Sequence, residues 1–354
     1  MSFYSRITRP ILFCFPAENV RDAAAWVLRN LFRGDFGQWL LRLRYCYRHP
    51  SLEREVFGVK FQNPIGAAAG ADKNSNIYRQ LGSVGFGFVE VGTVTPKPQR
   101  GSIRPRVFRL PKDRAIVNRM GFPNQGLERA KENLRRRAGS RKVVVGANIA
   151  KNTLTPPEGA VNDYLKLFRS LYEYVDYFTI NVTTLIDDVK FTDDNRKALL
   201  HAILDALFDF RRGQNQYRPV LLKISPNWPT EQIDEIVDLL LQTPLDGLVV
   251  AGTNPDIESL DISEKALARM SGGGISGAPL FEKAIELIAY VSEKSFHRYP
   301  IIGSGGVMSS QDARRMLDAG ASLVQVYTGL VYNGPKFVKN ICRGLSQAAD
   351  SQPQ

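Results

Sequence analysis

The feature that most constrains the fold of this chain is a series of eight short apolar runs, rich in β-branched residues, that begins after about residue 60. Amphipathic segments separate most of these runs. The alternation predicts repeated strand-and-helix units around a parallel core, and eight strands predict a (β/α)8 TIM barrel of the α/β class over 51–348. We predict strands at 64–69, 88–94, 142–149, 176–182, 219–224, 247–251, 300–303 and 322–327, and helices at 125–136, 161–174, 194–211, 230–241, 279–293, 310–319 and 335–348.

Two segments lengthen loops that follow strands. Residues 106–118 show strand-like alternation, and a polar stretch at 256–271 extends the loop after the sixth strand. Loops of this kind carry the chemistry of a barrel, so we expect both segments to border the active site.

Residues 1–50 do not fit the barrel pattern and predict a separate helical extension, with helices at 17–31 and 36–47. The segment holds eight arginines and no lysine against three acidic residues, which favours an anionic surface as its partner. The second helix mixes Trp, Leu and Tyr with Arg, a composition typical of a helix in a membrane interface. A helix packed on the barrel, with arginines that extend into water, is the alternative. The sequence leaves both open.

Composition excludes several other classes of protein. Hydrophobic residues make up 44% and charged residues 23%, so only the polar tail at 349–354 predicts disorder. No apolar run approaches the ~18 residues of a membrane span. Three scattered cysteines and three histidines offer no metal-binding spacing, so we expect an intracellular, metal-free chain. A net charge of +12 without a recognition motif does not predict nucleic-acid binding.

Glycine-rich turns follow the last two predicted strands. The sequence reads GSGG at 303–306 and YTG at 327–329. Barrels commonly bind a phosphate at this position through backbone N–H groups and a helix N-terminus, although glycine also serves tight turns. We expect a phosphate site here.

Four polar side chains stand at the carboxyl ends of other strands. Lys73 and Lys223 place cations at the barrel mouth, and Asn148 and Asn181 interrupt apolar runs, where an unpaired amide would be costly. Together with the phosphate site, they predict a planar polar ligand with a phosphate tail.

Several motifs together resemble dihydroorotate dehydrogenase, in order from about residue 15 to 345. They are NPIGAAAGADK at 63–73, EVGTVTP at 90–96, NRMGF at 118–122, GGISG at 273–277 and the two glycine-rich turns. The N-terminal helices and the insertion resemble the quinone-reducing, membrane-associated class 2 branch, in which added helices form a tunnel to FMN. Mitochondrial members add a transmembrane segment that this chain lacks. We therefore expect the bacterial form, peripheral on the cytoplasmic face of the cell membrane.

The resemblance implies FMN as the cofactor and assigns two sets of contacts. The FMN contacts fall on Ala69, Gly70, Lys73, Thr93, Asn148, Asn181, Lys223, Gly277, Gly306, Tyr327 and Thr328. The orotate contacts fall on Lys73, Asn118, Arg119, Met120, Gly121, Phe122 and Asn181.

The catalytic loop departs from the family pattern. Where the family reads Asn-(Val/Ile)-Ser-Ser-Pro-Asn-Thr, this chain reads NVTTLID at 181–187. Thr184 therefore occupies the position of the catalytic base, and Ile186 replaces a substrate-binding Asn. A threonine hydroxyl can act as serine does, although its added methyl group restricts its rotamers. Ile186 cannot hydrogen-bond the substrate.

A second departure follows the sixth strand, where the family's Thr-Asn-Thr-Thr becomes AGTNP at 251–255. Either Gly252 takes the position of the substrate Asn, or a two-residue insertion brings Asn254 there beside Thr253. On the quinone side, Arg21 stands where the family commonly has a His, and Arg109 matches an Arg of the tunnel.

We therefore expect FMN-dependent oxidation of dihydroorotate to orotate, a step of pyrimidine biosynthesis, with electrons passed to a quinone. One alternative is an FMN-dependent paralogue that acts on a different small anionic substrate, because the departures cluster on the pyrimidine side. The other is a barrel that serves as a membrane-docked interaction module without catalysis.

Overall fold

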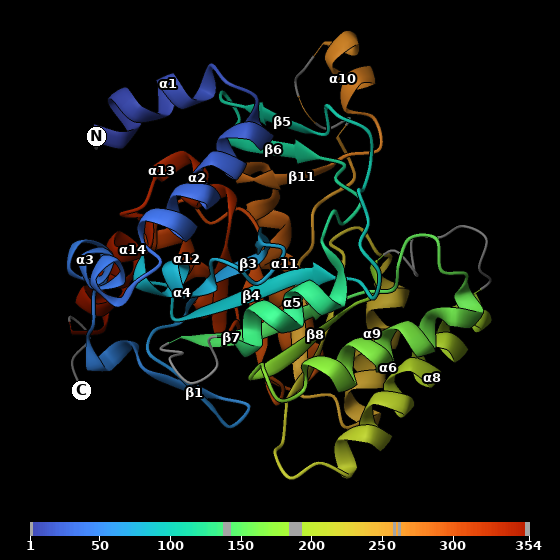
Figure 1. Cartoon of the computed structure of the whole chain (residues 1–354). Coiled ribbons are helices and arrows are strands. Elements are labelled where there is room, and N and C mark those ends of the chain that lie inside the picture. The colour runs from blue at the N-terminus through green and yellow to red at the C-terminus, as the bar shows by residue number, and fades with distance from the viewer. Residues whose placement is uncertain (1–2, 137–142, 184–192, 258–259, 261–262, 351–354) are drawn as a thin grey trace.

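A closed barrel of eight parallel strands forms the centre of the molecule in this computed structural model, which describes residues 3–136, 143–183, 193–257, 260 and 263–350 (Figure 1). The strands pair in chain order, and β13 pairs with β3 to close the barrel. Because all are parallel, their carboxyl ends meet at one mouth. The barrel strands are β3 (Ile65–Asp72), β4 (Phe88–Val94), β7 (Val144–Ile149), β8 (Tyr177–Asn181), β9 (Val220–Lys223), β10 (Gly247–Val250), β12 (Ile301–Ser304) and β13 (Leu323–Val326).

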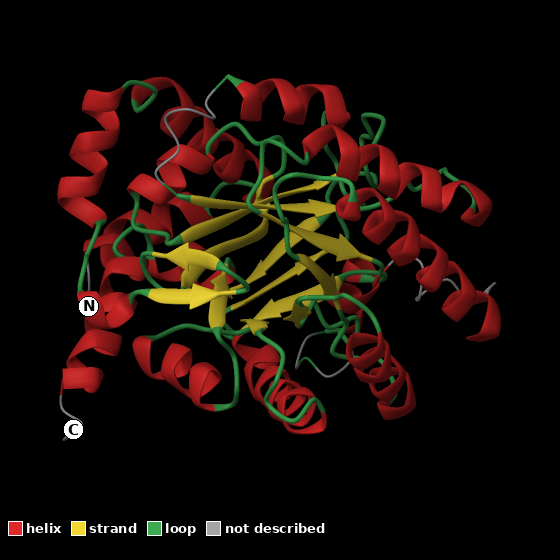
Figure 2. Cartoon of the chain, turned by 90° about the horizontal axis from the view of Figure 1, so that it is seen from below, coloured by secondary structure: helices red, strands yellow, loops and turns green. Residues whose placement is uncertain are grey.

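Helices surround the strands (Figure 2). Each buries an apolar stripe at helical spacing; in α9, Ile233, Val237 and Leu240 are buried. The helices that follow barrel strands are α4 (Tyr78–Ser83), α5 (Gly126–Arg135), α6 (Ala160–Leu171), α8 (Asp193–Arg212), α9 (Thr230–Gln242), α11 (Phe281–Lys294), α12 (Ser310–Asp318), α13 (Thr328–Asn333) and α14 (Phe337–Asp350).

A small antiparallel sheet stands on the mouth side of the barrel, because each of its strands belongs to a loop that follows a barrel strand. It consists of β5 (Val107–Leu110), β6 (Ala115–Asn118) and β11 (Gly274–Gly277), with β6 in the middle (Figure 1). Short helix α10 (Glu264–Met270) precedes β11. Backbone pairing thus joins two insertions that are far apart in sequence.

The N-terminal segment folds into a π-helical turn, η1 (Tyr4–Thr8), followed by α1 (Arg9–Phe13), α2 (Ala17–Leu31) and α3 (Asp35–Tyr45). Helix α2 contacts β5, and α3 contacts α4. Within the described residues, no helix combines the length and apolarity that a bilayer crossing requires.

Aromatic rings close the end of the barrel opposite the mouth. A hairpin of β1 (Arg54–Val56) and β2 (Val59–Phe61) brings Phe61 against Phe88, with ring centroids 5.4 Å apart. Tyr177 lies beside Phe88 at 6.5 Å. Gly146 leaves room for this ring, because a Cβ at Gly146 would overlap Tyr177. Small residues therefore alternate with large ones inside the barrel.

The structure confirms all eight predicted strands and the seven predicted barrel helices, with ends shifted by a few residues. The strand-like insertion at 106–118 is confirmed as the β5–β6 hairpin, and both N-terminal helices are present. Helix α14 continues to Asp350, two residues beyond its predicted end. The prediction lacked β1, β2, β11, α1, α4, α10 and α13, because elements of three to seven residues are too short for a periodic pattern.

We expect Gly146→Ala to destabilise the barrel by about 1–3 kcal/mol, because the added methyl group must displace the buried Tyr177 ring. Gly213→Ala is the matched control, since its Cβ would meet only a carbonyl oxygen at 3.7 Å. Thermal unfolding followed by circular dichroism measures both. An equal midpoint for the two variants would contradict this account of the barrel interior.

Candidate active site

Three polar side chains from neighbouring strands meet at the barrel mouth. The hydroxyl of Thr93 on β4 donates to Oδ1 of Asn148 on β7 at 2.7 Å. Nδ2 of Asn181 on β8 donates to the same oxygen at 3.3 Å. Thr183 adds a bond from its hydroxyl to Asn181 Oδ1 at 2.8 Å. These buried amides form one connected network, which places hydrogen-bonding groups at the mouth.

A buried carboxylate lies directly beneath this network. Glu90 on β4 is fully buried and accepts a hydrogen bond from Asn148 Nδ2 at 2.8 Å. Its other oxygen accepts bonds from Thr179 at 2.9 Å, Gln325 at 2.7 Å and Tyr177 at 3.3 Å. We call these five residues the Glu90 cluster. Its donors come from three other strands of the barrel.

Two lysines stand at the carboxyl ends of barrel strands, Lys73 directly after β3 and Lys223 at the end of β9. Burial, together with the charges of Arg21 and Arg106, lowers the pKa of Lys73 to about 7. The Lys73 ammonium lies 2.7 Å from the Met120 sulfur. Burial also lowers the pKa of Lys223, an effect that the Glu90 charge opposes. The mouth therefore holds cations that an anionic ligand would stabilise.

The glycine-rich turns after β12 and β13 present a group of free N–H donors. In the described part of the chain, the backbone N–H groups of Gly305, Gly306, Thr328 and Gly329 have no hydrogen-bond acceptor. Gly306 adopts a φ of +75°, and a Cβ there would collide with the backbone of Phe281. Donors of this kind after the last two strands of a barrel suit a phosphate.

Other positions assigned to the flavin line the same mouth. Ala69 and Gly70 lie in the second half of β3, and a Cβ on Gly70 would meet nothing within 4 Å. Gly277 has a φ of +106° and ends β11. Tyr327 immediately precedes Thr328. Burial raises the pKa of Tyr327, while the nearby charge of Arg21 opposes this effect.

The segment 118–122, assigned to the substrate, runs from the end of β6 into a turn. Asn118 pairs with Gly274 of β11, and Gly121 and Phe122 have positive φ values of 64° and 48°. The Arg119 guanidinium donates to the carbonyl of Ser271 at 3.0 Å, so it connects the insertion to the loop after α10. It also donates to the Pro105 carbonyl at 3.4 Å and lies over the Phe108 ring at 6.0 Å.

The altered loop after β10 folds against β11. Asn254 exchanges backbone hydrogen bonds with Ile275, and its side chain accepts a bond from the N–H of Asp256 at 2.9 Å. Thr253 is exposed, and the N–H of Gly252 donates to the Ile224 carbonyl. Thr184 and Ile186 lie outside the described residues.

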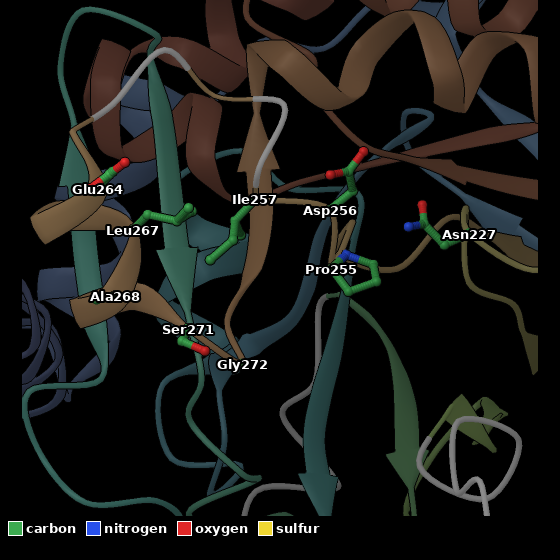
Figure 3. Close-up of a pocket in the computed structure, with 9 residues that line it drawn as sticks. All are labelled: Asn227, Pro255, Asp256, Ile257, Glu264, Leu267, Ala268, Ser271 and Gly272. Carbon is green, nitrogen blue, oxygen red and sulfur yellow. The ribbon is translucent and has the colours of Figure 1, made fainter.

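A cavity of about 610 Å³ opens beside this altered loop (Figure 3). Its walls come from the turn after β9, the loop after β10 and helix α10. They are formed by Asn227, Pro255, Asp256, Ile257, Glu264, Leu267, Ala268, Ser271 and Gly272.

A buried ion pair fixes α2 against the insertion. Arg106 contacts Glu18 at 2.6 Å, and both side chains are more than 90% buried. Burial acts to raise the pKa of Glu18, but the hydrogen bonds and charges of Arg106 and neighbouring arginines hold this pKa below its ordinary value. One turn along α2, Arg21 lies 3.5 Å from the Met120 sulfur. Arg21, which the family resemblance assigns to the quinone side, therefore lies near Lys73, because both contact the same sulfur.

Arg109 of β5 contacts the C-terminal end of α1 and the residues that follow it. Its guanidinium stacks on the Phe13 ring at 4.4 Å and donates to the carbonyls of Leu12, Phe13 and Phe15. Phe13 in turn packs edge-on against Tyr332 of α13, with centroids 5.4 Å apart.

Sequence reasoning missed the Glu90 cluster and the ion pair of Glu18 and Arg106. A signal for the cluster was present, because Glu90 and Gln325 each interrupt an otherwise apolar strand. No comparable signal marked Glu18, since an acidic residue in the first turn of a helix is ordinary.

Comparison with known proteins agrees with this geometry. The family model for dihydroorotate dehydrogenase matches residues 51–348. The chain is 40% identical to "Dihydroorotate dehydrogenase (quinone)" of Christiangramia forsetii, over 96% of this chain and 97% of the relative. A protein of the same name from Coxiella burnetii is also 40% identical, over 96% of each chain.

The fold of a solved relative is similar as well. The crystal structure of DHODH from Eimeria tenella in complex with ferulenol has a TM-score of 0.78 and 30% identity, and the match covers 94% of this chain and 92% of that one. The chain belongs to the dihydroorotate dehydrogenase family, and its relatives are of the quinone-dependent class 2.

Proposed function

We propose that this protein is an FMN-dependent dihydroorotate:quinone oxidoreductase of pyrimidine biosynthesis. The observation that carries the proposal is that the amide network, the two lysines and the free N–H donors share one barrel mouth in a chain of this family.

The residues present fit FMN. The N–H groups of Gly306 and Thr328 suit its phosphate, and the amides of Asn148 and Asn181, with Lys223, suit the polar edge of its ring. The open space above Gly70 leaves room for a planar group against the backbone. When bound, FMN supplies the acceptor for the hydride that leaves C6 of dihydroorotate.

The chain's own residues then bind and deprotonate the substrate. Lys73 is the proposed partner of the substrate carboxylate, and the side chains of Asn118 and Asn181 are proposed to hold the pyrimidine amides. Thr184 is the proposed base for the C5 proton. We propose that the wall of the substrate site is formed by residues Arg119 to Phe122 together with Thr253 and Asn254.

Exposed apolar and cationic side chains of the N-terminal helices support a peripheral membrane contact, with quinone entry near Arg21 and Arg109. Within residues 3–50, the large apolar side chains that are at least half exposed are Phe3, Ile11, Phe15, Trp26, Leu31, Phe36, Trp39 and Leu43, and the exposed arginines are Arg6, Arg29, Arg33, Arg44 and Arg48. This pairing suits an anionic bilayer surface. We propose the cytoplasmic face of the cell membrane as its location.

An anaerobic titration tests the function. Dihydroorotate should bleach the visible flavin band of the purified protein, and a quinone should restore it. Thr184→Ala should retain FMN but lower the rate of bleaching by about 10²–10⁴-fold, since proton transfer is lost. Thr184→Ser is the matched control and should keep a substantial rate. An unimpaired rate of bleaching in Thr184→Ala would disprove Thr184 as the base. A flavin band of the native protein that dihydroorotate never bleaches would disprove dihydroorotate as the substrate.

The lowered pKa of Lys73 predicts pH-dependent binding of orotate. Below about pH 7 the free protein already carries the charged ammonium, so affinity should be level. Above pH 7 binding must take up a proton, so the Kd should rise by up to about tenfold per pH unit. Equilibrium dialysis of the flavin-loaded protein measures this slope. Lys73→Arg should remove it, because a guanidinium stays protonated.

Vesicle co-sedimentation tests the membrane contact. The protein should bind phosphatidylglycerol-containing vesicles more tightly than pure phosphatidylcholine vesicles, and salt should weaken the difference. The double variant Trp39→Glu and Leu43→Glu should lose at least about tenfold in affinity, because two side chains that are 50% and 68% exposed no longer enter the interface. Leu154→Glu, at a 95% exposed leucine outside these helices, should bind as the native protein does.

A further inference from the structure

We propose that Glu90 is a positioning residue that fixes the amide orientation of Asn148, and through it the order of donors and acceptors at the flavin-binding mouth. The inference rests on the proposed FMN site. It assigns a role to a buried group that the mechanism above does not use.

Glu90 is surrounded by side chains that can donate hydrogen bonds to both of its oxygens. Its four hydrogen bonds come from Asn148, Thr179, Gln325 and Tyr177, and in each the partner can donate. A protonated carboxyl group would have to donate to one of these neighbours and lose an acceptor position. The ionised form accepts all four bonds.

Gln325 shows how strongly this charge orders its surroundings. The Gln325 amide directs its Nε2 to Glu90 at 2.7 Å, and within the described structure its buried Oε1 has no partner. In this orientation the Gln325 amide keeps a charge-assisted bond from its Nε2 to the carboxylate and forgoes a partner for its oxygen. The carboxylate is thus the acceptor that this amide faces.

The Asn148 amide, which lies one layer nearer the mouth, faces the same carboxylate. Its Nδ2 donates to Glu90, so its Oδ1 must face Thr93 and Asn181 and accept from both. The two ends of an asparagine amide are nearly equal in shape, so only their partners select the orientation. A flipped Asn148 would present N–H groups to two donors. Glu90 thus determines which atoms of the mouth network donate and which accept, without itself contacting the ligand.

The charge of Glu90 also acts on Lys223. The Lys223 side chain on β9 is half-buried and has no hydrogen-bond acceptor among the described residues. Among those residues, Glu90 is the acidic group whose charge raises the pKa of Lys223 against the effect of burial. Without that charge, Lys223 would lose its proton at a lower pH.

Fluorescence titration of the flavin-free protein with FMN, between about pH 6 and 8.5, tests the proposal. Glu90→Gln has the same shape but would present an N–H group to one of its four donors. We expect its Kd for FMN to rise at least about tenfold, with a loss that grows with pH as Lys223 deprotonates. Tyr177→Phe is the matched control, because it removes one bond to Glu90 but leaves Asn148 and the charge in place. It should bind FMN as the native protein does.

The outcomes separate this inference from the proposed function. A native protein that binds no FMN overturns both. Two results would overturn the role of Glu90 alone, provided that the native protein binds FMN. One is that Glu90→Gln has the native Kd for FMN across the pH range. The other is that Tyr177→Phe weakens FMN binding as much as Glu90→Gln does. If Glu90→Gln does not fold, Glu90→Asp carries the test, because it keeps the charge and withdraws the carboxylate from Asn148. It should bind FMN more weakly with the native pH profile, and native affinity would overturn the proposal.

Discussion

Pairing of the last barrel strand with the first is the constraint on which the site depends. Val324 to Val326 of β13 align with Ile65 to Ala67 of β3, and this contact converts a twisted sheet into a closed ring. Closure leaves no unpaired strand edge and only two ends. One end is filled by the rings of Phe61, Phe88 and Tyr177, so the other must receive the ligand.

Closure also explains why polar groups can lie deep inside the protein. The interior of an eight-stranded barrel is filled by side chains, and a charge placed there needs partners from several directions. Glu90 obtains them from β7, β8 and β13, which face it only because the sheet is closed. The polar network at the mouth is thus supported from below by the topology of the strands.

Sequence reasoning predicted the barrel because its strands are buried on both faces and read as continuous apolar runs, as in β4. It did not predict β1, β2 and β11, whose three or four residues show no pattern. At the site, Lys73, Asn148 and Asn181 could be predicted because polar residues at strand ends are unusual. The hydrogen-bond partners of Asn148 could not, because Glu90 lies on another strand and meets Asn148 only in the closed barrel. Burial of Glu18 depends likewise on its distant partner Arg106.

The N-terminal helices are fastened by residues near the other end of the chain. The Tyr4 hydroxyl donates to the Val331 carbonyl, Arg9 donates to the Tyr332 carbonyl, and Tyr47 bonds Ser346. A ribosome produces these partners last, so the contacts of Tyr4, Arg9 and Tyr47 form only when synthesis is nearly complete, well after the contacts with α4, Arg106 and Arg109 become possible. The apolar side chains that are exposed on the finished extension are exposed on the nascent chain as well, which can therefore meet a lipid surface before the barrel closes.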